Sequence, residues 1–78
     1  MITLKQAIDD AGGAAVAARV CEVSSRAIYK WLASGSLPRT EYTGETNYAA
    51  RLSAAAAARG KPFETDELKN VAAPKRAA

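Results

Sequence analysis

Residues 12–35 of this 78-residue chain read GGAAVAARVCEVSSRAIYKWLASG. The segment from Ala14 to Cys21 is rich in alanine, the strongest helix former. Ser24 is a typical N-cap residue, and Gly35 is a typical residue at a helix end. The stretch therefore predicts two short helices, the second from Ser25 to about Ser34, separated by a turn.

The apolar residues of this stretch fit two helices that cross at a large angle. Such a pair needs a small residue where the backbones approach, and Ala18 supplies it. Cys21 and Val23 flank the turn, while Ile28 and Trp31 have the helical spacing that directs both toward the preceding helices. These five residues predict the structural core of a helix-turn-helix motif over residues 14–34.

The rest of the chain predicts further helices. The first, over residues 4–11, is indicated by apolar residues at helical spacing, namely Leu4, Ala7, Ile8 and Ala11. An extended loop is expected over residues 39–44, a long helix from Thr46 to Arg59, and a last turn from Thr65 to Leu68. We thus expect one all-α domain of four to five short helices over residues 1–70, followed by a flexible basic tail over 71–78.

Composition excludes several classes of protein. Alanine supplies 19 of the 38 hydrophobic residues, so the core contributes only roughly 3–5 kcal/mol to stability. The chain has no His and one Cys, which excludes Ser/His catalysis, zinc clusters and disulfide frameworks. We expect no enzyme, metal, cofactor or small-molecule substrate, and the acidic residues Glu64, Asp66 and Glu67 are expected to compensate a helix dipole.

The charges are unevenly distributed. The net charge is +3, and no acidic residue occurs from Val23 to Thr40, where Arg26, Lys30 and Arg39 lie. A local basic patch favours a polyanionic partner, although a solvated helix face has the same appearance. No apolar run approaches the roughly 18–20 residues of a membrane span, so no membrane partner is expected.

Residues 12–35 resemble the Cro-type, lambda-repressor-like helix-turn-helix family of small phage and prophage repressors, and the likeness continues more loosely over 37–52. Such proteins carry a VSxxAIxxW-like recognition helix, which Val23-Ser24, Ala27-Ile28 and Trp31 match. Two positions depart from the family. Glu22 stands where a left-handed turn residue is commonly Gly, at a cost of about 1–2 kcal/mol, and Ala14 stands where a phosphate-binding Gln is frequent.

The resemblance implies a sequence-specific regulator of transcription whose second motif helix enters the major groove of double-stranded DNA. It implies base contacts from the exposed side of that helix, namely Ser25, Arg26, Tyr29 and Lys30. Of these, Lys30 suits a phosphate better than a base, and Ser25 and Tyr29 suit either. Backbone contacts are implied for Ser24, Arg39, Thr40 and Tyr42.

By the same resemblance the chain would be a repressor in the cytoplasm of a bacterial host cell, associated with the nucleoid. We expect it to form a homodimer on an inverted-repeat operator and to block promoter access, with Leu52, Phe63 and Leu68 as apolar candidates for the dimer contact.

Several alternatives stay open at this point. The same fold serves as an antitoxin or adaptor whose basic helix meets an acidic protein partner. Tyr29 can pack beside Trp31 instead of contacting DNA, and Cys21 can act as a redox sensor instead of a core residue. Lys75 and Arg76 can attract DNA weakly instead of remaining free.

Overall fold

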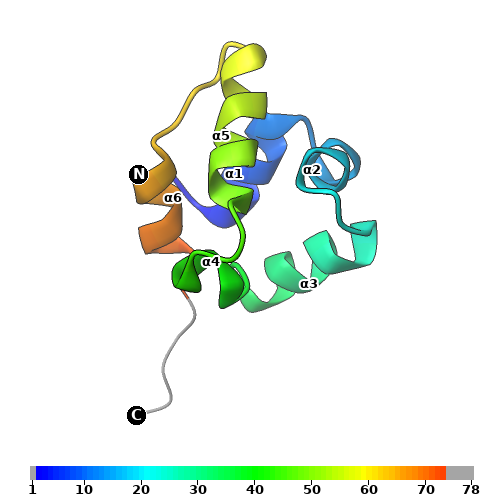
Figure 1. The fold of residues 1–78 in the computed structure, drawn as a ribbon. Helices are drawn as coiled ribbons and strands as arrows, with labels where there is room; N and C mark the ends of the chain where they lie inside the picture. The colour runs from blue at the N-terminus through cyan, green and yellow to red at the C-terminus, as the bar shows by residue number, and fades with distance from the viewer. Residues whose placement is uncertain (1, 74–78) are drawn as a thin grey trace.

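The computed structural model describes residues 2–73, and this part of the chain is entirely helical. It contains α1 (Leu4–Ala11), α2 (Ala14–Cys21), α3 (Ser25–Ser34), α4 (Thr40–Thr43), α5 (Tyr48–Ala58) and α6 (Thr65–Val71) (Figure 1). The predicted all-α class is confirmed. The expectation of four to five helices is corrected to six, because the segment predicted to be an extended loop contains the short helix α4.

Helices α1, α2 and α3 occupy the predicted ranges, because local signals define their ends. The hydroxyl of Thr3 accepts a hydrogen bond from the Gln6 amide at 3.1 Å, which caps α1. The hydroxyl of Ser24 accepts from the Ala27 amide at 3.3 Å, which caps α3. Gly35 ends α3 in the left-handed conformation, with φ 71°.

A tight turn separates α2 from α3. Glu22 adopts φ 58° and ψ 42°, the left-handed conformation anticipated for this position. The Glu22 amide donates to the Arg19 carbonyl at 3.2 Å and the Val23 amide to the Ala18 carbonyl at 2.9 Å, the pattern of a Schellman motif. Figure 1 looks almost along α2 while α3 runs across the view, so the two helices are strongly crossed. The chain therefore forms a helix-turn-helix and not one continuous rod.

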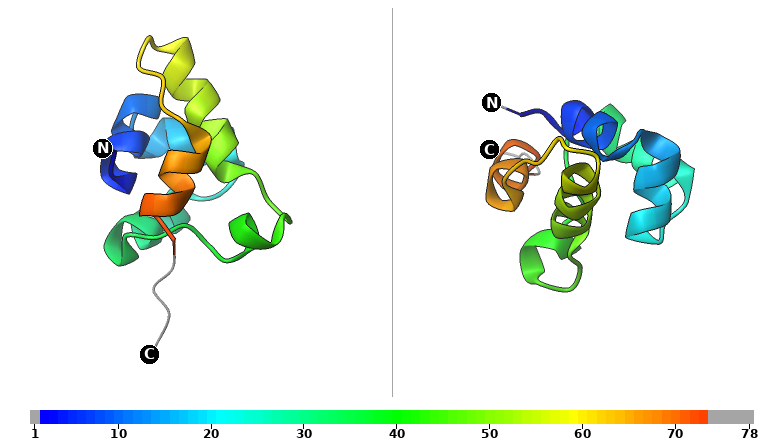
Figure 2. Two further views of the ribbon diagram at one scale, coloured as in Figure 1. Left: turned by 90° about the vertical axis from the view of Figure 1, so that its left-hand side faces the viewer. Right: turned by 90° about the horizontal axis from the view of Figure 1, so that it is seen from above.

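Helix α5 lies at the centre of the fold. It packs against α1, α2 and α6, and Figure 2 shows α6 and α2 on opposite sides of it. Ala49, Leu52 and Ala56 are the buried residues of α5. The largest fully buried side chains come from five different parts of the chain: Ile8, Ile28, Leu37, Leu52 and Leu68. No helix within residues 2–73 is long and apolar enough to cross a membrane.

A buried carboxylate determines where α5 begins. Glu41, in α4, is only 3% exposed. It accepts hydrogen bonds from the amides of Tyr48 and Ala49 at 2.7 and 2.9 Å and from the Thr46 hydroxyl at 3.0 Å. A carboxylate at a helix N-terminus satisfies free amides and favours the helix dipole. Helix α5 consequently begins at Tyr48, two residues later than predicted.

The C-terminal helix is longer than predicted. It ends at Val71 instead of Leu68, and Ala72 is buried. The Ala72 carbonyl accepts a hydrogen bond from the Leu37 amide at 2.8 Å, which ties the end of α6 to the segment after α3. The expected tail therefore starts no earlier than residue 73, and residues 74–78 lie outside the described part of the chain.

Candidate nucleic-acid interface

One side of α3 belongs to the core and the other faces solvent. Ile28 is fully buried and Trp31 is 7% exposed, and the Trp31 ring lies 5.0 Å from the ring of Tyr48, centre to centre. On the opposite side Ser25, Arg26, Tyr29 and Lys30 are all exposed. Tyr29 is 61% exposed, so the aromatic partner of Trp31 is Tyr48 and not Tyr29. The four residues assigned to base contacts thus share one accessible face.

The cations of this region are available to an external partner. Arg26, Lys30 and Arg39 are exposed, and none of the three side chains forms a hydrogen bond or ion pair with another residue in the range 2–73. These three residues of the acid-free stretch therefore form a basic surface whose charges are not paired within residues 2–73.

A hollow of about 280 Å³ lies beside the C-terminal end of α3. Lys30 and Arg39 contribute cationic groups to its lining, and Trp31 and Leu37 contribute apolar groups. The hydroxyls of Ser34 and Ser36, which lie 3.1 Å apart, complete its polar lining. Ammonium, guanidinium and hydroxyl donors around one hollow suit a phosphate group.

The four residues expected to contact the DNA backbone differ in whether their side chains are exposed and free of internal hydrogen bonds. Ser24 uses its oxygen to cap α3 but keeps its hydroxyl hydrogen, and Arg39 is exposed. Thr40 is half-buried and pairs with the Thr46 hydroxyl at 3.2 Å. Tyr42 donates its only hydroxyl hydrogen to the Lys69 carbonyl at 2.6 Å, and burial, with a smaller contribution from Glu41, raises the pKa of Tyr42. Tyr42 therefore cannot donate to a phosphate while this internal bond is intact.

The residues assigned to the motif core lie where the crossed helices require them. Ala18, Cys21, Ile28 and Trp31 are buried, and Val23 is half-buried against the same core. Burial raises the pKa of the Cys21 thiol to about 11. A protonated, enclosed thiol reacts slowly with oxidants, which favours the core role of Cys21 over redox sensing.

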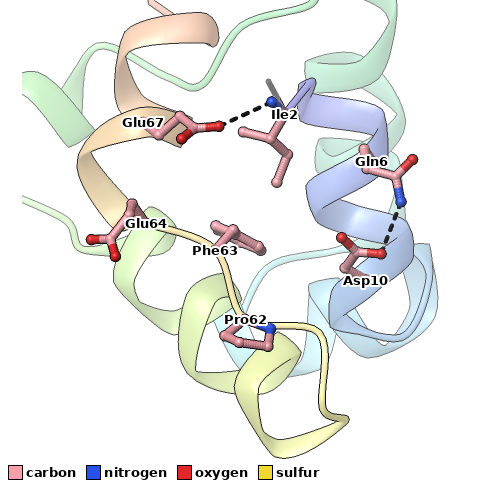
Figure 3. A pocket seen from close by; sticks show the side chains of 7 residues that line it. All are labelled: Ile2, Gln6, Asp10, Pro62, Phe63, Glu64 and Glu67. Atoms are coloured by element: carbon pink, nitrogen blue, oxygen red, sulfur yellow. Dashed lines mark hydrogen bonds between the residues drawn. The ribbon is translucent and has the colours of Figure 1, made fainter.

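A second hollow, of about 500 Å³, lies between α1 and the segment leading into α6 (Figure 3). Ile2, Pro62 and Phe63 supply apolar groups to its lining, and three carboxylates, Asp10, Glu64 and Glu67, supply its charge. The amide of Ile2 donates to Glu67 at 3.0 Å. Asp66 and Glu67 lie in the first turn of α6, as expected for residues that compensate a helix dipole. Because these carboxylates repel phosphate, this hollow is unsuited to nucleic acid.

The expected dimer contacts require a correction. Leu52 and Leu68 are fully buried in the core of the single chain, so neither can contact a second copy without opening the fold. The apolar character of both residues predicts a dimer contact, but it reflects packing between α5, α6 and α1. Phe63 is half-buried and lines the acidic hollow, so it is the one candidate of the three that reaches a surface.

Two residues that shape this region were missed by the sequence reasoning. In the sequence Glu41 resembles a surface acid, and its partners Tyr48 and Ala49 lie seven and eight residues later, beyond the spacing of an ordinary helix cap. Arg51 lies on an alanine-rich helix and bonds to the turn between α2 and α3. Its spacing from Asn47, four residues earlier, is the only signal that a sequence offers for it.

Comparison with known proteins adds an independent observation. No protein-family model and no solved structure matches the chain. The 8.4 kDa cro protein of Escherichia phage HK022 is 53% identical over 56 residues, which cover 72% of this chain and 70% of that protein. Identity at this level and coverage, together with a helix-turn-helix whose α3 presents a basic face, shows that the chain belongs to the Cro family of phage DNA-binding regulators, which are not enzymes.

Proposed function

We propose that the chain represses transcription by binding an inverted-repeat operator as a homodimer, with α3 of each copy in the major groove. The observation that carries this proposal is the exposed side of α3, where Ser25, Arg26, Tyr29 and Lys30 lie opposite the buried Ile28 and Trp31. A helix with this division between core and solvent fits the groove of B-DNA.

Arg26 is the proposed centre of base recognition. It lies in the first turn of α3 and is exposed, and its guanidinium forms no bond to another residue within 2–73. Its two parallel donors match O6 and N7 of guanine, a pair worth about 1–3 kcal/mol of discrimination. Ser25 would contact a neighbouring base edge, and Tyr29 would pack on a thymine methyl group.

The DNA backbone would follow the hollow at the end of α3. Lys30 and Arg39 line that hollow and suit two neighbouring phosphates, and Ser24 would donate its hydroxyl to the backbone at the other end of the helix. Thr40 and Tyr42 would join only by giving up their bonds to Thr46 and Lys69, so we treat them as secondary contacts.

A homodimer would place two α3 helices about 34 Å apart, one turn of DNA. Phe63 is the remaining candidate for the dimer contact. Because a two-fold contact is self-complementary, one centred on the acidic hollow would bring Asp10, Glu64 and Glu67 of both copies together. We therefore propose that the two-fold axis lies away from the acidic hollow, so that Phe63 contributes only from the edge of the dimer contact. We also propose that the repressor acts at the nucleoid of its host.

Selection of duplexes from a random oligonucleotide pool tests this proposal. We expect an enriched inverted repeat whose half-sites are about 10 base pairs apart, with affinity that falls steeply as salt rises. Arg26→Ala should lose affinity for the enriched duplex and relax specificity at one base pair. Arg59→Ala, which removes an equal charge at an exposed position at the far end of α5, serves as the matched control.

Two results of this experiment have different meanings. An enriched site without two-fold symmetry would reject the homodimer while leaving DNA binding intact. A chain that binds no duplex even at low salt would reject the repressor and favour the adaptor alternative, in which α3 meets an acidic protein.

A further inference from the structure

The turn of the helix-turn-helix contains a conformation that few residues adopt without support. Among residues 2–73, Glu22 is the only non-glycine residue with positive φ. Its side chain is 75% exposed, so packing does not hold it in place. The Schellman bonds satisfy the carbonyls of Ala18 and Arg19 but leave the Val20 carbonyl without a backbone partner in that motif.

Arg51 of α5 supplies a hydrogen-bond donor to the Val20 carbonyl and a positive charge to the Glu22 carboxylate. Its Nη1 atom donates to the Val20 carbonyl at 3.0 Å and to the Glu22 carboxylate at 2.9 Å. Its Nε atom donates to the Asn47 side-chain oxygen at 3.0 Å, and Asn47 directly precedes α5. The guanidinium is thereby oriented from its own helix and bonds to both the backbone and the side chain of the turn.

Helix α5 therefore holds α3 at two points. Tyr48 packs its ring against Trp31 in the C-terminal half of α3, and Arg51 holds the turn that leads into its N-terminal end. Tyr48 and Arg51 are three residues apart and lie on neighbouring parts of one helix face. The buried residues Ala49 and Leu52 anchor α5 in the core. The two contacts with α5 therefore fix the orientation of α3 relative to the core.

The same contact neutralises a charge. Glu22 is the last acid before the stretch from Val23 to Thr40, and it lies two residues before the N-cap of α3. An unpaired carboxylate at this point would repel a phosphate backbone that approaches the first turn of α3. The ion pair with Arg51 offsets the charge of that carboxylate without requiring a glycine at the turn.

We propose that Arg51 is a positioning residue of the DNA-binding site, which sets the orientation of α3 by holding the Glu22 turn and masks the Glu22 carboxylate from DNA. This inference rests on the proposed function, in which α3 enters the major groove. Because the ion pair is largely exposed, it contributes little to global stability, and its removal affects binding more than folding.

A double-mutant cycle on the duplex recovered by random selection tests the proposal. Arg51→Ala should weaken binding by about tenfold, while its melting temperature falls only by the roughly 4–8 °C expected for the loss of one partly buried hydrogen bond. In the Glu22→Gly background the loss caused by Arg51→Ala should shrink to about twofold, because glycine adopts the left-handed turn unaided and carries no carboxylate. Arg51→Lys, which keeps the charge but not the fork of donors, should fall between parent and Arg51→Ala.

Two results of this cycle would overturn the proposal. An equal loss in the parent and in the Glu22→Gly background would show that Arg51 contacts DNA directly or acts without Glu22, and either result overturns the proposal. A loss in Arg51→Ala no greater than that in the control Arg59→Ala would overturn it as well.

Amide hydrogen exchange of the chain without DNA provides a second measurement. In Arg51→Ala the Val23 amide, which bonds to the Ala18 carbonyl, should exchange faster, while the Gly13 amide, which bonds to the Ile8 carbonyl at the end of α1, keeps its rate. If both amides accelerate equally, Arg51 is a general stabilising residue and the proposal is wrong. Because this measurement needs no duplex, it distinguishes failure of the inference from failure of the proposed function, which would appear as a parent chain that binds no DNA.

Discussion

Helices α3 and α4 both carry polar side chains, but the two helices use them in opposite ways. On α3 the side chains of Arg26, Tyr29 and Lys30 extend into solvent and bond to no other residue within 2–73. On α4 the side chains of Glu41 and Tyr42 are both hydrogen-bonded within the fold. Polar groups that a small fold leaves unused are the ones available to a partner, whereas those it uses hold its loops in place.

The largest expected effect is on the α4 side of this comparison. Glu41→Ala leaves the amides of Tyr48 and Ala49 and the hydroxyl of Thr46 without their acceptor. We expect the free energy of unfolding to fall by about 3 kcal/mol, a large share of the stability of so small a core. Urea denaturation followed by circular dichroism measures this, with Glu45→Ala, at an exposed neighbouring position, as the control. Equal losses in the two variants would show that the buried carboxylate has no special role.

The next largest effect is expected on α3, where a substitution should lower DNA affinity and leave stability unchanged. Arg26→Ala should weaken binding to the selected duplex by about 1–3 kcal/mol and leave the melting temperature unchanged. Fluorescence anisotropy measures the duplex affinity, and thermal denaturation of the same samples measures the melting temperature. A fall in melting temperature comparable to that of Glu41→Ala would remove the distinction between the two helices.

A smaller effect is expected from Tyr42, for which the family resemblance implies a contact with the DNA backbone. Tyr42→Phe loses the hydrogen bond to the Lys69 carbonyl and should lower the free energy of unfolding by about 1 kcal/mol. Duplex affinity should not change, because the hydroxyl serves the fold. Loss of affinity at constant stability would return Tyr42 to the DNA-contacting surface.

The smallest effect concerns Lys30. As a phosphate contact in the hollow beside α3, it should be worth little in specificity. Lys30→Ala should weaken selected and unrelated duplexes by the same factor and reduce the salt slope of log affinity by about 1. Titrations at several salt concentrations measure the slope. A loss confined to the selected duplex would reassign Lys30 to a base.

The first half of the fold was predictable because its signals are local. Ser24 and Gly35 predicted the two ends of α3, and Ile28 and Trp31 predicted which side of α3 is buried. The exposed face of α3 then followed, together with the candidate base contacts.

The second half was not predictable in the same way, because its interactions join residues far apart in the chain. Helix α4 has no side-chain cap of its own, and its Glu41 and Tyr42 reach α5 and α6 across 7 and 27 residues. The apolar character of Leu52 and Leu68 was read correctly, but nothing local tells whether such a residue faces its own core or a second copy. Arg51 was missed for the same reason, since its partners Val20 and Glu22 lie 31 and 29 residues away.

The hydrogen bond from the Leu37 amide to the Ala72 carbonyl holds the end of α6 beside the segment that follows α3, which affects where a label can be attached. Leu37 lines the hollow that we assign to the DNA backbone, so a bulky group attached at Ala72 or Ala73 would lie beside the proposed path of the duplex. At the other end the Ile2 amide is held by Glu67 next to the acidic hollow, on a surface that repels DNA. Fusions and fluorophores intended for binding assays therefore belong at the N-terminus.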